Sequence, residues 1–332
     1  MPLSGKTPMV KINYLYEGEK RHLYAKLEAY NPSGSIKDRV AEHIVQRAEK
    51  NGELKPGMAI IEVTSGNTGI ALASIGARKG YDVHIFMPSW VSEERKTIIR
   101  MYGATVHEVT REEGGFAAAF DRADDLARSI NAYMPLQFEN IENVNAHKLY
   151  TGREIIQQLP KVTDFVSGIG TGGTLMGVAA ALKMAGNARI IAIEPDTLPL
   201  LRDPNAVGTH KIEGIGDDFI PKLVDTAAID EVFDINDDDA VEMSRKLSLQ
   251  MGLGVGISSG ANFLGCVLAT RSPEQEIATV FADDNKKYLS TALSSSESCC
   301  RDGISSKIEL VSIEKLPDCA YLQACMERLP KQ

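Results

Sequence analysis

The stretch AIIEVTSGNTGIALA, residues 59–73, places a short apolar run, a polar loop and an apolar helical pattern directly after one another. A β-branched run that leads into a helical pattern is typical of a strand–helix unit in a parallel sheet. Similar apolar runs recur further along the chain, at DVHIFMP (82–88), TVHEVT (105–110), DFVSGIG (164–170) and ARIIAIEP (188–195). Near-continuous apolar strands between helices are buried on both faces, so the sequence predicts an α/β fold of mostly parallel sheets flanked by helices. The region 196–237 is less regular, and we interpret it as long active-site loops.

The composition predicts a globular protein of about two domains. The chain has 332 residues, 43% of them hydrophobic and 24% charged, which is enough to bury a substantial core. Its net charge of -9 argues against a nucleic-acid partner, because nucleic-acid-binding domains usually carry a basic face. No apolar run approaches the roughly 18 residues that span a bilayer, and the first residues do not resemble a secretory signal. We therefore expect a cytoplasmic protein without a membrane partner.

The cysteines are unevenly distributed. Cys266 lies in an apolar helical pattern, whereas Cys299, Cys300, Cys319 and Cys325 all lie near the C-terminus. They lack the paired C-x-x-C spacing of zinc sites, so we expect no metal centre. We interpret them as incidental thiols of a reduced tail, and a redox or disulfide role stays open.

The loop GIGTGGT, residues 168–174, follows one predicted strand and begins a predicted helix. Backbone N–H groups of such a glycine-rich loop, at the positive end of a helix dipole, can hold a phosphate without a cationic side chain. Gly168, Gly170 and Gly173 also fit the dinucleotide pattern G-x-G-x-x-G, which is a weak signal by itself. A third interpretation is a tight turn with no ligand.

The loop TSGNTG, residues 64–69, is a second predicted helix N-terminus, and it is rich in hydroxyl groups. Thr64, Ser65 and Thr68 could donate O–H groups to a carboxylate, together with backbone N–H groups. Asn67 is a neutral amide that could donate to a phenolate-like oxygen. The alternative is an elaborate N-cap, although one serine would be enough for that purpose.

A lysine stands in the polar turn NPSGSIKDR, residues 31–39, directly before an amphipathic helical pattern. Lys37 is either a solvated surface charge or the reactive amine of an enzyme. A reactive lysine, a phosphate cradle and a carboxylate cradle together describe pyridoxal phosphate. This cofactor needs a lysine for its Schiff base, and its enzymes need a pocket for an amino acid's carboxylate.

Nine motifs follow one another from about residue 5 to residue 293: GKTPMV, NPSGSIKDR, EVTSGNTGIALA, MPSWVSEERKTIIRMYGA, QFEN, GIGTGGTLMGV, HKIEGIGDDFIP, GISSGAN and KKYLSTAL. In these motifs and their order the sequence resembles the cysteine synthase (O-acetylserine sulfhydrylase) and cystathionine β-synthase family of pyridoxal-phosphate enzymes. The resemblance implies that Lys37 is the Schiff-base lysine. It implies cofactor contacts from Asn67, Gly170, Thr171, Gly172, Gly173, Thr174 and Ser258, and substrate-carboxylate contacts from Thr64, Ser65, Thr68 and Gln137.

The resemblance also implies the reaction. Lys37 would hold the cofactor as an internal aldimine and, once displaced by a β-substituted alanine, would remove the α-proton as general base. The β-substituent would leave to give an α-aminoacrylate, to which a sulfide or thiol co-substrate would add, so the expected reaction is β-replacement. Cysteine synthesis from O-acetylserine and sulfide is the main expectation. The alternative consumes cysteine, releases sulfide and gives serine, lanthionine or cystathionine.

The family fold is fold-type II, with two open twisted sheets. We expect a smaller mobile domain over 38–145, which carries the carboxylate loop and closes over the substrate. Residues 1–37 and 146–298 would form the larger cofactor-binding domain. The tail 299–332 has no counterpart in the resemblance, and its EKLPDCAYLQACMERL could form an amphipathic helix on the body or on a partner subunit. The resemblance implies a homodimer.

Two aspartates depart from the cysteine synthase pattern. Counting back from Tyr288, the place of a serine that faces the pyridine nitrogen falls on Asp284, where a carboxylate would keep that nitrogen protonated. In the other interpretation, Asp284 meets Lys286 or solvent. Asp217, in EGIGDDFIP, either accepts a proton from the attacking nucleophile or is a surface acid.

Three other functions compete with β-replacement. Serine or threonine deaminases and cysteine desulfhydrases share the lysine segment but typically have a different phosphate loop. A nicotinamide-dependent dehydrogenase could use GIGTGG with Glu194 for the ribose, but this leaves Lys37 and TSGNTG unexplained. A regulatory binding protein would hold the cofactor and turn over no β-substituted alanine.

Overall fold

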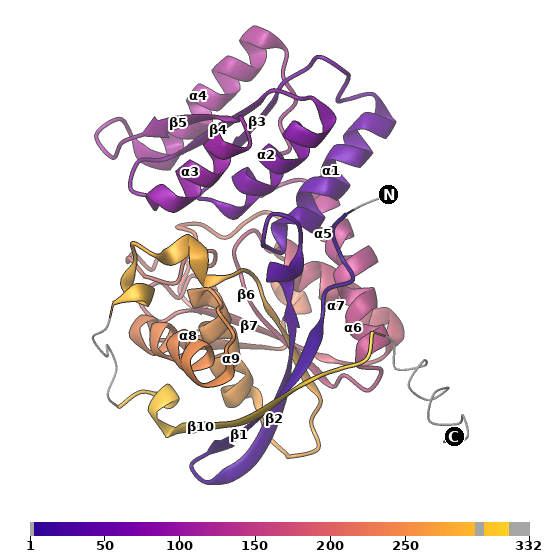
Figure 1. Cartoon of the computed structure of the whole chain (residues 1–332), viewed down its shortest axis with the longest axis vertical. Coiled ribbons are helices and arrows are strands. Elements are labelled where there is room, and N and C mark those ends of the chain that lie inside the picture. Colours follow the sequence, from indigo (N-terminus) through magenta and orange to yellow (C-terminus); the bar gives the residue numbers. More distant parts are fainter. Residues whose placement is uncertain (1–2, 296–301, 319–332) are drawn as a thin grey trace.

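The computed structural model describes residues 3–295 and 302–318 of the chain. Within these residues the strands form two separate sheets, one of seven strands and one of three. We call the three-stranded sheet and helices α1–α4 the small unit, and the rest of the described chain the large unit (Figure 1). Lys37 is the first residue of α1, so it stands where the chain passes from the large unit into the small one.

The large unit is built on the seven-stranded sheet. From one edge to the other its strands are β10 (Ile308–Lys315), β1 (Met9–Tyr16), β2 (Glu19–Leu27), β9 (Ile277–Phe281), β6 (Asp164–Gly168), β7 (Arg189–Pro195) and β8 (Glu231–Ile235). The five strands from β2 to β8 are parallel, and β1 runs antiparallel to both of its neighbours. The helices of the large unit are α5 (Ile141–Ala146), α6 (Gly152–Gln158), α7 (Gly173–Ala185), α8 (Asp237–Met251) and α9 (Ile257–Ala269).

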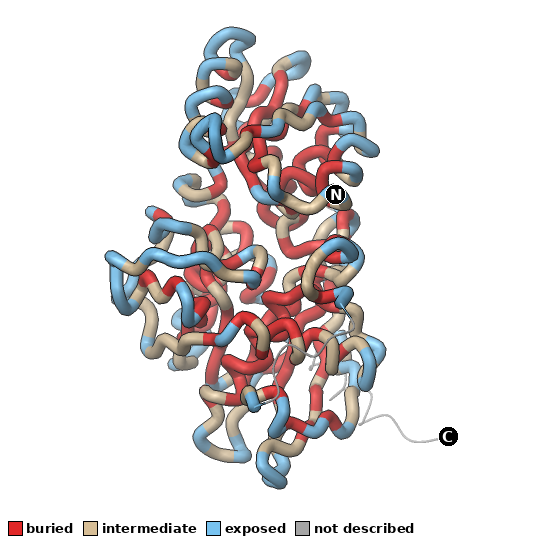
Figure 2. The backbone as a smooth tube through the Cα atoms, turned by 90° about the vertical axis from the view of Figure 1, so that its left-hand side faces the viewer, coloured by how far each residue is buried: buried red, intermediate tan, exposed pale blue. Residues whose placement is uncertain are grey.

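These helices cover the two faces of the large sheet. Apolar residues of α8 and α9 pack on one face and those of α6 and α7 on the other. Strands covered on both faces are apolar at nearly every position, as the sequence predicted, and β9 is buried throughout. Figure 2 shows the buried backbone running through the middle of both units.

The small unit is built on β3 (Ile60–Val63), β4 (Val83–Pro88) and β5 (Thr105–Val109), which are parallel. Its helices are α1 (Lys37–Asn51), α2 (Asn67–Lys79), α3 (Glu93–Met101) and α4 (Gly115–Ile130). The apolar core beneath α1, α2 and α3 lies on one side of this sheet, and α4 packs on the other. The expected fold class, two mostly parallel sheets flanked by helices, is therefore confirmed.

Four strands, β1, β2, β8 and β10, were not predicted from the sequence. β1 and β2 form an antiparallel hairpin with Glu17 and Gly18 at its turn, both at positive φ, as a two-residue hairpin turn requires. β8 lies inside the region 196–237 that we had interpreted as loops. β10 lies inside the expected tail 299–332 and pairs with β1, so part of that segment belongs to the large sheet.

Other expectations about the tail lie outside the described residues. These are most of its proposed amphipathic helix and the cysteines Cys299, Cys300, Cys319 and Cys325. Cys266 is a free, buried thiol on α9. No helix in the described ranges has the length and hydropathy needed to cross a membrane.

Candidate active site

A cavity lies at the carboxyl ends of β3 and β6, where the N-termini of α2 and α7 face it. It encloses about 930 Å³ including its open mouth, within the size range of ligand pockets. Parallel sheets bring such strand ends and helix N-termini together, so this is the place where ligands are expected. Its lining includes most of the residues expected from the sequence: Lys37, Thr64, Ser65, Asn67, Thr68, Gln137, Gly170, Thr171, Gly172, Thr174, Asp217 and Ser258.

Lys37 is held in the cavity by the turn before it. The Ile36 N–H donates to the Ala282 carbonyl at 2.8 Å, which ties the turn to the end of β9. The Lys37 N–H donates to the Ser35 hydroxyl at 3.2 Å. Burial lowers the pKa of the Lys37 amine, while the nearby carboxylates of Asp217 and Asp283 oppose that shift. A lowered pKa increases the fraction of neutral amine, the form that acts as nucleophile and base.

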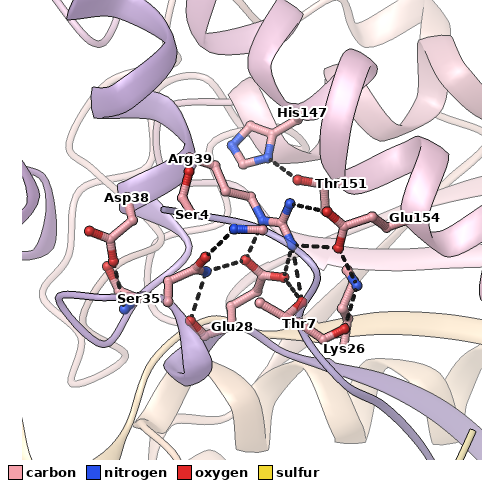
Figure 3. A network of polar contacts seen from close by, with 12 residues as sticks. Ser4, Thr7, Lys26, Glu28, Ser35, Asp38, Arg39, His147, Thr151 and Glu154 are labelled. Carbon is pink, nitrogen blue, oxygen red and sulfur yellow. Dashed lines mark hydrogen bonds and ion pairs between the residues drawn. The ribbon is translucent and has the colours of Figure 1, made fainter. Parts of the chain in front are cut away.

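A buried polar network fixes the first turn of α1 to the large unit (Figure 3). Arg39, two residues after Lys37, is paired with Glu28 at 2.6 Å and with Glu154 at 2.8 Å. Thr7 donates its hydroxyl to Glu28 at 2.7 Å, and Lys26 is paired with Glu154 at 2.8 Å. These bonds satisfy the buried charges and leave α1 little freedom at its start.

The carboxylate loop begins α2 on the other side of the cavity. Thr68 donates its hydroxyl to the Gln137 side-chain oxygen at 2.5 Å, and the Gln137 amide donates to the Val63 carbonyl at 3.0 Å. The Gln137 N–H also donates to the buried carboxyl of Glu62, whose pKa burial raises to about 7. Thr68 and Gln137, two of the expected substrate-binding residues, are therefore held in place by hydrogen bonds within the protein.

The phosphate loop begins α7. Gly172 has a φ of 83°, which favours glycine, and as the N-cap residue it has no side chain to cap this helix start. The Gly173 N–H is taken by the Thr171 hydroxyl, and the following N–H groups of the first turn are left for a ligand. His147 bonds the Thr174 hydroxyl at 3.2 Å, and Asn143 donates to the Thr171 hydroxyl at 2.9 Å.

Gly173 does not line the cavity, unlike its neighbours in this loop. A Cβ at this position would collide with the side chain of Asn143, so the glycine is required for close packing against α5. Its N–H donates to the Thr171 hydroxyl at 3.3 Å. The structure thus gives Gly173 a role in shaping the loop.

Asn67 and Ser258 lie in the cavity at the starts of α2 and α9. The Asn67 amide donates to a carboxylate oxygen of Asp283 at 2.7 Å, whereas its own oxygen is buried without a partner. Tyr288 donates its hydroxyl to the same Asp283 oxygen at 2.9 Å. Ser258 is almost fully buried and faces the cavity. Buried polar atoms normally have a hydrogen-bond partner, so the unpartnered Asn67 oxygen at the cavity wall indicates that a ligand group binds there.

The geometry favours the second interpretation of Asp284, in which it does not face the cofactor ring. Asp284 does not line the cavity. Its side chain accepts from the Lys286 N–H at 3.1 Å, and its carboxylate lies 3.9 Å from the Lys286 amine. The carboxylate thus caps the turn Asn285–Tyr288 and meets Lys286, as in the other interpretation, and Ser258 is one of the hydroxyl residues that line the cavity.

Asp217 is brought into the cavity by the long loop after β7. Burial and the neighbouring Asp218 raise its pKa to about 6, although Lys37 and His210 act in the opposite direction. A carboxylate with this pKa is largely ionised at neutral pH and still takes up a proton readily. The interpretation of Asp217 as an ordinary surface acid does not fit this environment.

The cavity residues that were missed from the sequence include Arg95, Glu213 and Tyr288. Arg95, on α3, is paired with Glu213 of the large unit, and its guanidinium lies 4.8 Å from the centre of the Tyr288 ring. Arg95 and Tyr288 lie inside motifs that we used for the resemblance, but only the fold shows that their side chains meet across the cavity.

The residues present fit pyridoxal phosphate. Lys37 supplies a partly desolvated amine, and the uncapped start of α7 supplies N–H donors for a phosphate. The unpartnered oxygen of Asn67 and the hydroxyl of Ser258 supply polar partners for ring atoms. In the described ranges no group of three or more His, Cys, Asp or Glu side chains could hold a metal ion.

Comparison with known proteins agrees with this reading of the cavity. The family model described as "Pyridoxal-phosphate dependent enzyme" matches residues 1–283. A curated cysteine synthase of Staphylococcus aureus is 39% identical over 294 residues, which cover 87% of this chain and 94% of that protein.

Solved structures extend the match. A hydrogen sulfide-producing enzyme from Fusobacterium nucleatum is 43% identical with a TM-score of 0.91, covering 95% of this chain and 96% of that one. A mutant hydrogen sulfide-producing enzyme, also 43% identical, has been solved with an α-aminoacrylate intermediate, with a TM-score of 0.90 over 94% of this chain and 97% of that one. A cysteine synthase from Entamoeba histolytica is 35% identical with a TM-score of 0.82, covering 92% of each chain. The chain therefore belongs to the family of pyridoxal-phosphate-dependent enzymes.

Proposed function

We propose that this enzyme carries out β-replacement on a β-substituted L-alanine. The observation that carries the proposal is the convergence of Lys37 with Thr68 and Gln137 on one cavity. The hydroxyl and amide groups of the TSGNTG loop would hold the substrate carboxylate, and Lys37 would hold the cofactor covalently. When bound, pyridoxal phosphate supplies an electron sink that stabilises negative charge at the substrate α-carbon.

The side chains of the cavity have separate tasks in this proposal. The freed Lys37 amine takes the proton from the α-carbon, which its lowered pKa favours. Asp217, which also lines the cavity, takes the proton of the incoming nucleophile. Thr174, held by His147, and the N-terminus of α7 bind the phosphate group of the cofactor.

Two substrate pairs fit this arrangement. O-acetylserine with sulfide corresponds to the cysteine synthases among the relatives. Cysteine with water or a thiol corresponds to the hydrogen sulfide-producing relatives. Sulfide is acidic enough to react without a base, whereas water and neutral thiols benefit from one, so the position of Asp217 favours the cysteine-consuming reaction.

With water as nucleophile the reaction balances as cysteine plus water giving serine plus hydrogen sulfide. The carbon–sulfur bond breaks, a carbon–oxygen bond forms, and Asp217 takes the proton that water loses. With a second cysteine as nucleophile, the products are lanthionine and hydrogen sulfide.

The test compares the two substrate pairs on cofactor-loaded protein. We expect cysteine alone to release sulfide and give serine or lanthionine in equal amount, and O-acetylserine with sulfide to be the slower pair. Lys37→Ala should lose the visible absorbance of the bound cofactor and all turnover. Lys286→Ala, at a lysine whose side chain is 82% exposed, is the matched control. If neither pair reacts, the proposed function is wrong; if only O-acetylserine reacts, the choice of substrate is wrong.

The assembly and motion of the chain belong to the same proposal. We infer a cytoplasmic homodimer, which sedimentation of the purified enzyme would test. We also propose that residues 38–145 move as a smaller domain relative to residues 1–37 and 146–298 and close over the substrate carboxylate. Closure would exclude bulk water during the reaction.

A further inference from the structure

The loop that carries Asp217 lies directly over the phosphate loop. Gly216 donates its N–H to the Ile169 carbonyl at 2.8 Å, and the His210 ring bonds the Gly216 carbonyl. A Cβ at Gly170 would lie 2.5 Å from the Gly214 carbonyl oxygen, so the two loops are in close backbone contact. The middle of the Asp217 loop is thus fixed to the large unit.

The first end of this loop is bound to the small unit. Glu213 forms an ion pair with Arg95 of α3, and Arg95 is only 4% exposed. The Arg95 guanidinium also lies over the ring of Tyr288, which belongs to the large unit. The Arg95 side chain is desolvated and the Glu213 side chain is one third exposed, so the attraction is only partly screened by water and couples the position of α3 to that of the loop.

The second end of the loop reaches the small unit indirectly, through Phe138, which packs on Phe120 of α4. The Phe219 ring lies 5.1 Å from the Phe138 ring at an interplanar angle of 65°, and Phe138 lies 6.4 Å from Phe120 of α4. Edge-to-face aromatic pairs of this kind attract each other beyond the effect of their burial. Asp217 therefore stands between two contacts that both reach the small unit.

We propose that Glu213 and Phe219 are positioning residues, which hold Asp217 in the cavity only while the small unit is closed. The inference rests on the proposed function, because it concerns the step in which Asp217 takes the proton of the nucleophile. When the small unit moves away, Glu213 loses Arg95 and Phe138 loses its support from Phe120. Gly216 stays bound to the phosphate loop, but the Asp217 carboxylate is no longer held against the substrate from both sides. Closure would then serve to assemble the base as well as to exclude water.

The consequence is a difference between the two halves of the reaction. Release of the β-substituent depends on Lys37, whose supports lie in the turn before α1 and in the Arg39 network. Addition of the nucleophile depends on Asp217. Loss of Glu213 or Phe219 should therefore slow the second half-reaction and leave the first nearly unchanged.

The experiment measures both halves in Phe219→Ala and Glu213→Gln, with cysteine as substrate for the cofactor-loaded enzyme. Quenched flow gives the rate of sulfide release in the first turnover, and steady-state serine or lanthionine formation gives the second half. We expect the rate of sulfide release to stay within about twofold of the wild type. The rate of serine or lanthionine formation should fall about 10–100-fold, the usual effect of a misplaced catalytic group. Phe219→Leu should recover part of the rate. Glu139→Gln, which removes an exposed ion pair with Lys222, is the matched control.

A double variant separates positioning from general structural damage. In an Asp217→Asn background, Phe219→Ala should change the rate of the second half-reaction by less than about twofold. Both substitutions act through the Asp217 carboxylate, so removing it first leaves Phe219 nothing to position. Amide hydrogen exchange of the segment 213–219 gives a readout independent of activity. It should be faster in Phe219→Ala and Glu213→Gln than in the wild type and unchanged in Glu139→Gln.

The pH profile gives a further signature. Lys37, Asp218 and His210 act on Asp217 directly, and the pockets that Asp217 lines also contain Arg95, Arg111, Lys211, Glu213 and Glu194. Greater hydration of Asp217 in Phe219→Ala should move the acid limb of the second half-reaction to lower pH. Equal losses in both halves, or full additivity in the double variant, would overturn the inference. Wild-type enzyme that releases no sulfide from cysteine would instead overturn the proposed function.

Discussion

Arg39 Nε lies 2.6 Å from a carboxylate oxygen of Glu28, and both side chains are almost completely buried, two residues from the reactive lysine. The pair connects α1 of the small unit with the segment after β2 of the large unit. Burial by itself would raise the pKa of Glu28, but Arg39 and Lys26 outweigh that effect and lower it. The Arg39 guanidinium and the Glu28 carboxylate therefore both stay charged inside the protein, and each charge is stabilised by the other.

Glu28→Gln should lower the free energy of unfolding by about 3–5 kcal/mol, because it leaves the Arg39 charge buried without its main partner. Urea unfolding of the cofactor-loaded enzyme at neutral pH checks this. Asp124→Asn removes an exposed pair with Arg128 and should cost less than about 1 kcal/mol. A loss for Glu28→Gln as small as that of the control would show that the network does not stabilise the fold.

The same network predicts a pH dependence through Glu154. Burial by itself would raise the pKa of Glu154, but hydrogen bonds and charges from Arg39 and Lys26 lower it from 4.5 to about 2. The unfolded chain therefore takes up this proton first as the pH falls, and stability is lost between about pH 4.5 and pH 2. Unfolding free energies measured between pH 5.5 and pH 2.5 should fall less steeply in Glu154→Gln than in the wild type. Parallel slopes in the two proteins would contradict the assignment.

The residues of the cavity that could be predicted from the sequence are those in compact motifs. Lys37, Thr68 and Gly172 lie in loops whose residue types already suit their ligands, so local chemistry was sufficient. The assignment of Asp284 to the pyridine nitrogen rested on a count along one loop, and such a count cannot say which of two adjacent aspartates points inward. Asp283 is the one that meets Asn67, and Asp284 caps a turn.

The parts of the fold that were missed depend on contacts between distant segments. β10 pairs with β1 although about 300 residues separate them, and nothing in IELVSIEK says which strand is its partner. The β1–β2 hairpin did carry a local signal, an alternating pattern with Glu17 and Gly18 between its halves. The ion pair of Arg95 and Glu213 carried no local signal, because neither residue is unusual in its own segment of the sequence.

Gln137→Ala should weaken substrate binding in the carboxylate loop. A hydrogen bond to a charged group contributes about 1.5–3 kcal/mol, so kcat/KM should fall roughly 10–150-fold. Because Thr68 loses its acceptor at 2.5 Å in the same variant, the loss should lie toward the upper end of that range. Steady-state kinetics with cysteine measure the change, and Gln250→Ala, at an exposed position of α8, serves as control. An unchanged kcat/KM would remove Gln137 from the substrate site.

Asp217→Asn should make the enzyme more stable and less active. Burial and Asp218 raise the pKa of Asp217 from 3.8 to about 6, so the folded state binds this proton more tightly than the unfolded chain does. The charged carboxylate therefore costs stability increasingly as the pH rises through that interval, and its removal should raise the melting temperature at pH 7.5 but not at pH 3.5. The second half-reaction should meanwhile fall about 10²–10⁴-fold, the usual contribution of a general base. Asp121→Asn, at an exposed position of α4, should change neither quantity. A variant that is less stable at pH 7.5, or that forms serine or lanthionine at the normal rate, would show that Asp217 is not a strained catalytic base.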